Sequence, residues 1–150
     1  MVHVSHSFEF TIDLPVERAA PLFGPEGERA WAGDDWDPHF VYPQPAKDIE
    51  GSVFTIRHAA HTATWVNTVF DLRSGRMQYV YFIANIMTAT IDVKLTSEGN
   101  ERTRVWVRYQ RTALSEEGAE HVRAVGDKDA KSGPEWKAQI DAMLAKERAH

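Results

Sequence analysis

Two histidines, His58 and His61, flank a predicted strand turn, with only Ala59-Ala60 between them. If the alanines formed a two-residue hairpin turn, the two imidazoles would face each other and could share one metal ion. A zinc site would need further ligands from elsewhere in the chain, and Ala-Ala is a poor sequence for so tight a turn. The sequence therefore favours exposed histidines in a longer loop, and it predicts no metal site and no cofactor.

An acidic, aromatic loop at residues 32–45 holds a second set of candidate groups. Paired carboxylates can share a proton and so provide an acid and a base near neutral pH, although aspartates in loops more often cap turns. His39 is the one group of this loop whose unperturbed pKa lies near neutrality. We therefore take His39 as the candidate general base. The acids in or beside the loop are Glu28, Asp34, Asp35 and Asp37.

Tyr79 and Tyr81 are the hydroxyl-bearing candidates of a predicted strand, and their spacing places both on one face. If that face is the inner face of a curved sheet, the hydroxyls can orient a ligand in an apolar pocket. If it is the outer face, they are sheet surface, and an apolar outer face would fit a homodimer. The same two alternatives hold for Trp65 and Trp106, which the pattern allows on the outer side.

Composition limits the classes of partner. The chain has 150 residues, a formal net charge of -5 and no cysteine. Such a length suits one domain, which we expect to span residues 1–150. The negative charge gives no attraction to nucleic acid, and the absence of cysteine excludes disulfides and thiolate catalysis. Because we see neither a leader-like segment nor an apolar run long enough for a membrane span, we expect a cytoplasmic protein.

Hydrophobic periodicity predicts six strands and a long closing helix. The first strand ends near Asp13, and residues 16–23 follow as a short helix. Ser115 is expected to cap another helix. Residues 127–133 are expected to break the chain before the closing helix, residues 132–147, where apolar residues recur at helical spacing. The other strands are expected at residues 52–58, 62–72, 76–84, 87–96 and 103–112.

One amphipathic helix cannot cover six strands completely, so the sheet must curl around it and leave a space. We therefore predict an α+β fold in which a curved, six-stranded antiparallel sheet wraps around the C-terminal helix, with two short helices after the first strand. The enclosed space fits a small hydrophobic molecule. The residues expected to line it are Trp36, Phe54, Phe70, Tyr79, Tyr81, Met87, Tyr109, Trp136, Ile140 and Met143.

Several short segments resemble sequences of one protein superfamily. They lie at residues 8–18, 22–23, 31, 36–38, 51–54, 65–71 and 109–118. Together with the order of elements, they resemble the helix-grip proteins of the START, polyketide-cyclase and pollen-allergen (SRPBCC) superfamily. Residues 25–28, 36–38 and 114–118 are similar to a bacterial subgroup of unassigned function. The resemblance implies the helix-grip fold, but it transfers no catalytic residue, because fold does not fix function.

Three functions follow as hypotheses. The first is binding of a small hydrophobic or aromatic ligand between the sheet and the closing helix. The second is a cyclase, dehydratase or hydrolase that uses the same cavity, with His39 moving a proton. The third is a protein-interaction module that resembles chaperone activators and uses an aromatic outer face.

Overall fold

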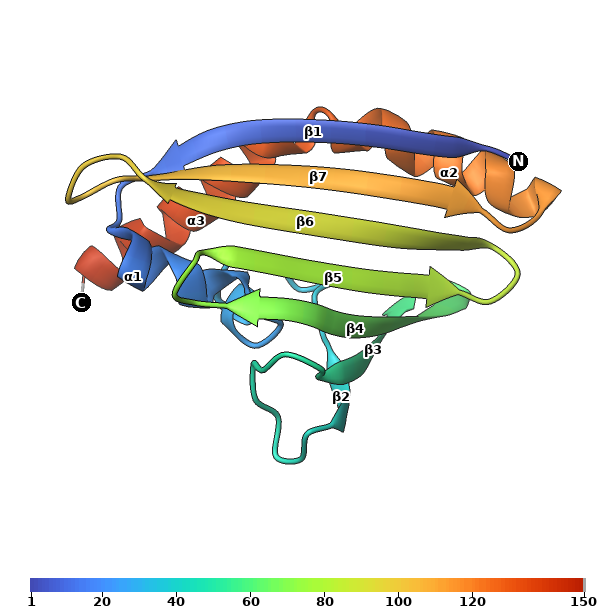
Figure 1. The fold of residues 1–150 in the computed structure, drawn as a ribbon, viewed down its shortest axis with the longest axis horizontal. Helices are drawn as coiled ribbons and strands as arrows, with labels where there is room; N and C mark the ends of the chain where they lie inside the picture. Colours follow the sequence, from blue (N-terminus) through green and yellow to red (C-terminus); the bar gives the residue numbers. More distant parts are fainter. Residues whose placement is uncertain (150) are drawn as a thin grey trace.

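A seven-stranded antiparallel sheet frames the protein in the computed structural model, which describes residues 1–149 (Figure 1). The strand order is β1-β7-β6-β5-β4-β3-β2, so β2 to β7 follow their order in the sequence and β1 pairs with β7 at the far edge. The strands are β1 (His3–Ile12), β2 (His39–Tyr42), β3 (Val53–His58), β4 (His61–Asp71), β5 (Arg76–Ile83), β6 (Met87–Ser97) and β7 (Thr103–Ala113).

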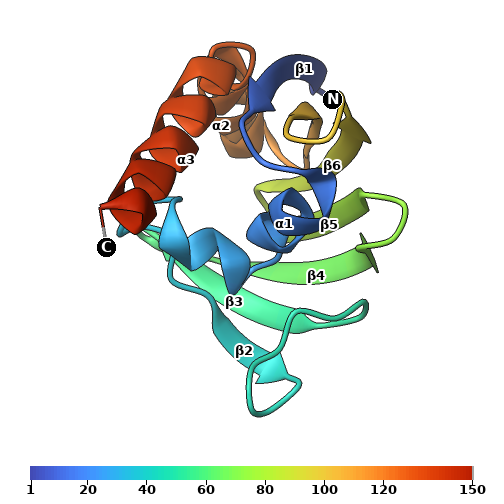
Figure 2. The same cartoon turned by 90° about the vertical axis from the view of Figure 1, so that its left-hand side faces the viewer.

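The helices lie on the inner side of the curved sheet, which partly encircles α1 and α3 in the end-on view of Figure 2. Within residues 1–149, no helix is long and apolar enough to cross a membrane. This arrangement confirms the predicted α+β helix-grip fold. The helices are α1 (Val16–Ala19), η1 (Ala20–Phe23), η2 (Gly27–Ala30), α2 (Glu116–Asp129) and α3 (Ser132–Arg148).

The inner face of the sheet carries the two tyrosines of β5. Tyr79 and Tyr81 are 3% and 8% exposed, and Trp65 of β4 stacks on Tyr81 with ring centroids 4.2 Å apart. The interpretation that allowed Trp65 on the outer face is therefore wrong, because its ring completes an inner aromatic layer. Trp106 does lie on the outer face, where it is half-buried between its register partners on β1 and β6, Glu9 and Lys94.

The acidic loop contains a strand that the sequence did not predict. Residues His39–Tyr42 form β2, which pairs with β3 at the sheet edge. Phe40 stacks on Phe54 of β3 with ring centroids 5.5 Å apart. The segment His-Phe-Val-Tyr does not alternate polar and apolar residues, so this strand depends on its contact with β3. The sheet therefore has seven strands instead of six.

The turn between β3 and β4 also differs from the expectation. Ala59 and Ala60 do form a two-residue turn, with φ of 50° at Ala59, and His58 pairs with His61. The longer loop predicted here was wrong, because the continuous β3–β4 register holds the chain in a tight turn. His61 packs against His121 of α2, with ring centroids 6.5 Å apart. Among residues 1–149, no three metal-ligating side chains gather at one point.

The start of α2 follows the prediction. The Ser115 hydroxyl accepts a hydrogen bond from the backbone N–H of Gly118 at 3.0 Å, as an N-cap does. A side chain at Gly118 would collide with the Ile86 carbonyl, so helix and sheet meet closely there. The predicted break at residues 127–133 is wrong in extent, because α2 continues to Asp129 and α3 starts at Ser132.

Candidate functional site

A cavity of about 200 Å³ lies between the inner face of the sheet, η2 and α3. Pockets for drug-sized ligands usually measure about 300–1,000 Å³, whereas an apolar cavity of about 150 Å³ already admits benzene. The space therefore suits one aromatic ring with a short substituent. The lining residues are Glu28, Trp31, Ala32, Trp36, Trp65, Tyr79, Ile91, Tyr109, Glu135, Trp136 and Gln139.

Aromatic rings from distant parts of the chain form most of this lining. Trp136 of α3 lies 5.2 Å from Trp31 and 6.4 Å from Tyr109, measured between ring centroids. On the other side of the cavity, Trp36 contacts Trp65 edge-on at 5.3 Å. Tilted and edge-on pairs are the arrangements that aromatic quadrupoles favour, so the rings form a stable wall without stacking face to face.

Two of these tryptophans are held by backbone hydrogen bonds. The indole N–H of Trp31 donates to the Leu22 carbonyl at 2.8 Å. The indole N–H of Trp36 donates to the Pro25 carbonyl, also at 2.8 Å. Because each indole has a single N–H, both rings have their polar atom satisfied by the protein and present carbon to the cavity.

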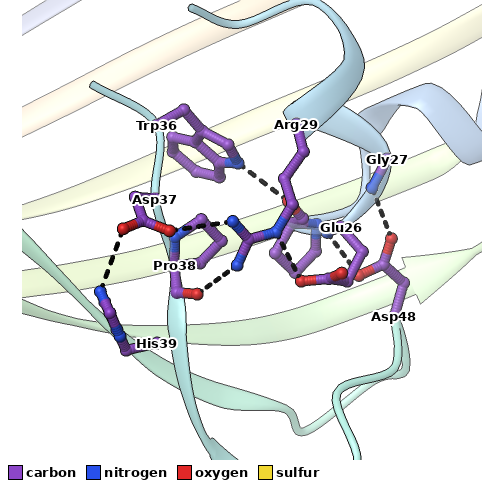
Figure 3. A network of polar contacts seen from close by, with 9 residues as sticks. Glu26, Gly27, Arg29, Trp36, Asp37, Pro38, His39 and Asp48 are labelled. Atoms are coloured by element: carbon purple, nitrogen blue, oxygen red, sulfur yellow. Dashed lines mark hydrogen bonds and ion pairs between the residues drawn. The ribbon is translucent and has the colours of Figure 1, made fainter. Parts of the chain in front are cut away.

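A polar network outside the cavity holds η2 in place (Figure 3). The Asp48 carboxylate accepts hydrogen bonds from the backbone N–H groups of Glu26 and Gly27, at 2.8 and 3.0 Å. Arg29 pairs with Glu26 and Asp37 at 2.8 and 2.9 Å. These contacts fix the short helix from both sides, so the residue between them, Glu28, has a defined position.

Glu28 points inward and is only 6% exposed. Its Oε2 atom lies 2.9 Å from the Tyr79 hydroxyl, which also contacts the Phe23 carbonyl oxygen. A phenol has one hydrogen to donate, so it cannot satisfy an ionised Glu28 and the carbonyl together. If Glu28 carries a proton, it donates to Tyr79 and Tyr79 donates to Phe23. The geometry therefore favours the neutral acid.

The electrostatic environment favours the same state. Burial raises the pKa of Glu28 to about 8, with a further rise from the Asp48 charge, while the hydrogen bond from Tyr79 partly lowers it. Burial also raises the pKa of the Tyr79 and Tyr109 hydroxyls above their ordinary value. At neutral pH the cavity thus contains a protonated carboxylic acid and two protonated phenols.

A second polar network lies beside the cavity, behind Tyr109. Arg111 of β7 pairs with Asp129 of α2 through two hydrogen bonds, at 2.7 and 3.0 Å, and it also donates to the Tyr81 hydroxyl. Its guanidinium carbon lies 4.8 Å from the centroid of the Tyr109 ring. Arg111 and Asp129 are buried, so this bidentate pair attaches the end of α2 to the sheet.

The structure brings four of the predicted ligand-binding residues to the cavity: Trp36, Tyr79, Tyr109 and Trp136. Phe54 and Tyr81 stack behind Trp65 and support it. Met143 borders a separate surface depression near Gly33 and Lys146. Three more predicted residues, Phe70, Met87 and Ile140, are not among those that line the cavity.

His39 lies away from the cavity, on the edge strand β2. Its side chain is 72% exposed and its Nε2 atom lies 3.2 Å from Asp37 Oδ2 (Figure 3). It borders a surface groove with Asp34, Asp35 and Asp37, together with two residues of β3. The acids of the loop therefore separate: three stay at the surface, and Glu28 alone enters the cavity.

Sequence reasoning did not single out Glu28, Trp31 or Trp65 as ligand contacts. The spacing of Glu28 and Trp31 was an available signal, since residues three apart lie on the same side of a helical turn. Trp31 was also one of the positions at which the sequence resembles the helix-grip superfamily. Glu28 was grouped with the loop aspartates because all are acidic. Only the fold separates a carboxyl that faces solvent from one that faces rings.

No protein-family model and no curated protein sequence matches the chain, but solved structures do. Norcoclaurine synthase from Thalictrum flavum is 9% identical, with a TM-score of 0.67 over 99% of this chain and 88% of the synthase. CalU16 from Micromonospora echinospora is 15% identical, with a TM-score of 0.58 over 96% and 82%. Ara h 8.0201 is 12% identical, with a TM-score of 0.57 over 96% and 99%.

These three proteins share little sequence with the chain, so the likeness concerns the fold. It covers almost the whole chain and includes both the curved sheet and the closing helix. The chain therefore has the helix-grip fold of the START, polyketide-cyclase and pollen-allergen superfamily that its sequence resembles.

Proposed function

We propose that the protein binds a small, single-ring aromatic molecule in the cavity between the sheet and α3. The observation that carries this proposal is the lining, in which four tryptophans and two tyrosines surround a space of about 200 Å³. Lipids and multi-ring polyketides are too large for that volume. The ligand contacts are Trp31, Trp36, Trp65, Tyr79, Tyr109 and Trp136, with Glu28 as the central polar group.

Two physical terms support binding of a ring here. Removing apolar ligand surface from water contributes about 25 cal/mol per Å². Each well-oriented contact between aromatic rings adds about 0.5–1.5 kcal/mol. Because Trp31 and Trp36 are already held by hydrogen bonds to Leu22 and Pro25, these two side chains have little entropy left to lose on binding.

A structural relative gives a further reason to expect single rings. Norcoclaurine synthase from Thalictrum flavum has a solved structure in complex with dopamine and hydroxybenzaldehyde, and it is 9% identical to this chain with a TM-score of 0.64. Both molecules contain one aromatic ring. A helix-grip protein of comparable size can therefore hold ligands of the class proposed here.

Titration with 2-phenylethanol, followed by tryptophan fluorescence and calorimetry, tests the proposal. We expect saturable binding to the wild-type protein. Ile91→Phe adds a ring to the cavity side of β6 and should abolish binding while the protein stays folded by circular dichroism. Val80→Phe adds a ring to a half-buried, outward-facing site on β5 and should leave binding unchanged. Undiminished binding by the Ile91→Phe variant would refute the cavity as the site.

Glu28 favours a second candidate function, acid–base catalysis on a ligand in the same cavity. A carboxyl with a pKa of about 8 exchanges its proton near neutral pH, and such groups concentrate at catalytic sites. One reaction class open to a single carboxylate base is proton abstraction next to a carbonyl.

Hydrogen–deuterium exchange of phenylacetaldehyde in heavy water, followed by proton NMR, tests this candidate. We expect the enzyme-dependent exchange rate to rise with pH up to about 8, as Glu28 becomes the basic carboxylate. Glu28→Gln should remove the enzyme-dependent rate. An equal rate in the variant would exclude Glu28 as the base and leave the binding function standing.

A further inference from the structure

The charged side chains that line the cavity are all acidic. Glu28 and Glu135 are its ionisable acids, and among residues 1–149 no lysine, arginine or histidine lines the space. The nearby guanidinium of Arg111 is held by Asp129 and lies behind the Tyr109 ring. An anionic ligand would thus meet acids and ring faces without a compensating cation.

The rings favour positive charge in the same way. The face of tryptophan or tyrosine is the negative end of its quadrupole, and it attracts ammonium groups within about 6 Å of the centroid. The ring planes of Trp31 and Trp136 make an angle of 57°, and those of Trp36 and Trp65 an angle of 87°. In a tilted or edge-on pair the face of one ring meets the edge of the other, so the lining does not consist of ring edges alone.

One acceptor in the site has no partner. Glu28 Oε2 lies 2.9 Å from the Tyr79 hydroxyl, whereas Glu28 Oε1 forms no hydrogen bond within residues 1–149 and is not one of the fully buried polar atoms, so it is open to the cavity. A carboxyl oxygen that faces a cavity accepts a hydrogen bond from water or from a ligand. A ligand that fits this site therefore brings a donor, such as an N–H, to Oε1.

We propose that the ligand is a primary amine on a short chain from one aromatic ring, bound as the ammonium ion with its nitrogen at Glu28. This inference rests on the proposed function, since it names the chemical class that the same cavity selects. The ring lies among the tryptophans, and the ammonium group donates to Glu28 Oε1 while Tyr79 stays on Oε2. Glu135 at the α3 side of the cavity adds a second negative charge.

Binding of the cation is coupled to loss of the Glu28 proton. With a pKa of about 8 in the free protein, Glu28 is neutral at pH 7 and must ionise to form the ion pair. The charged or titratable groups that face it are Tyr79 and Tyr109 from the sheet, Asp48 from the loop before β3, and Glu135 from α3. The phenols keep their protons near neutral pH, so Glu28 is the group that releases one.

Three probes with one carbon skeleton separate charge from shape: 2-phenylethylamine, 2-phenylethanol and phenylacetate. We expect calorimetry at pH 8 to show the amine binding at least tenfold more tightly than the alcohol, and no binding of phenylacetate. Amine affinity should rise about fiftyfold from pH 6 to pH 8. Titrations at pH 7 in buffers of different ionisation enthalpy should show close to one proton released per amine bound.

Glu28→Gln is the matching variant, because glutamine resembles the neutral acid and can still donate to Tyr79. It should lose the pH dependence and the proton release, and its preference for the amine over the alcohol should disappear. Glu50→Gln removes the same charge from an exposed loop and should behave as wild type.

The outcomes distinguish this inference from the proposed function. If the alcohol binds as tightly as the amine, or if phenylacetate binds best, the ammonium assignment is wrong and ring binding stands. If the amine binds without pH dependence and without proton release, Glu28 is not its partner and the inference is likewise overturned. If none of the three probes binds, ring binding itself fails.

Discussion

Among residues 1–149 three carboxyl side chains are buried, those of Glu28, Asp92 and Asp129. Two of them, Glu28 and Asp129, lie beside tyrosines of β5 and differ in one partner. Asp129 lies opposite Arg111 in a bidentate pair that also reaches Tyr81. Glu28 lies opposite Tyr79, two residues earlier on β5, and no cation within residues 1–149 pairs with it. Both carboxyls are less than 10% exposed, so burial alone does not distinguish them.

The difference between the two sites is therefore the guanidinium. A buried charge is tolerated where a paired group and hydrogen bonds replace its hydration, and a carboxyl without such a partner keeps its proton instead. Asp129 has its hydrogen-bonding capacity occupied by the protein, whereas Glu28 keeps one oxygen and one exchangeable proton in a cavity. The first site attaches α2 to the sheet, and the second can interact with a ligand.

Arg111→Met gives the largest expected effect on this comparison, because it turns the Asp129 site into a buried carboxyl without a cation. Removing one partner of a buried pair costs about 3–5 kcal/mol, so we expect a loss of that size in the free energy of unfolding at pH 7. Urea denaturation measures it.

Arg104→Met is the matched control for that variant. Arg104 pairs with Glu9 and Glu98 on the outer face, and its side chain is 50% exposed. Exposed ion pairs contribute about 0–1 kcal/mol. Similar losses in both arginine variants would mean that burial of the Asp129 pair has no special role.

The next largest expected effect is on the pH dependence of stability, which tests whether Glu28 is a buried, neutral acid. The folded-state pKa of about 8 exceeds the ordinary glutamate value of 4.5, so the unfolded chain binds fewer protons between these values. The contribution of Glu28 to the free energy of unfolding should therefore be highest at low pH and fall by about 3 kcal/mol between pH 5 and pH 8.

Glu28→Gln cannot ionise, so its contribution should stay level over this range. Urea denaturation at several pH values should show the wild-type curve falling towards pH 8 relative to the variant curve. Parallel curves for the two proteins would contradict a neutral, buried Glu28.

Tyr79→Phe and Tyr81→Phe compare the two sites through their hydroxyls. Each variant leaves a buried polar group short of one hydrogen bond, so each should lose about 2 kcal/mol of stability at pH 7. Only Tyr79→Phe should also shift the pKa of Glu28, because Tyr79 is the side chain that shares a hydrogen bond with it. A shift in the pH–stability curve of the Tyr81 variant would show that the two networks are coupled.

The fold was largely predictable because its elements are long and strongly patterned. Burial alternates over all 8 residues of β5 and over most of the 11 residues of β6 and of β7, and Ser115 signals the start of α2 through its own side chain. The elements that the sequence did not predict are short, or they depend on contacts between distant parts of the chain. The four-residue strand β2 depends on its contact with β3, and the last turn of α2 depends on the Arg111–Asp129 pair.

The candidate site was less predictable, since its polar group differs from its neighbours only in direction. Glu28 and Asp35 are both acids near tryptophans in the sequence, but Asp35 is exposed and Glu28 is buried. That direction is set by Asp48, a residue about twenty positions away that holds the backbone of η2. The strand pattern likewise placed Tyr79 and Tyr81 on one face and could not say which face was inner.

His39→Ala is expected to have the smallest effect, and it tests the residue that sequence reasoning preferred as general base. The side chain is 72% exposed, and its polar contact is with Asp37 at 3.2 Å. Surface substitutions of this kind change stability by less than about 0.5 kcal/mol. Because His39 lies outside the cavity lining, 2-phenylethanol affinity and phenylacetaldehyde exchange should both equal wild type. A large loss of either would move the functional site from the Glu28 cavity to the acidic groove beside β2, and the contrast between the buried carboxyls of Glu28 and Asp129 would then concern stability alone.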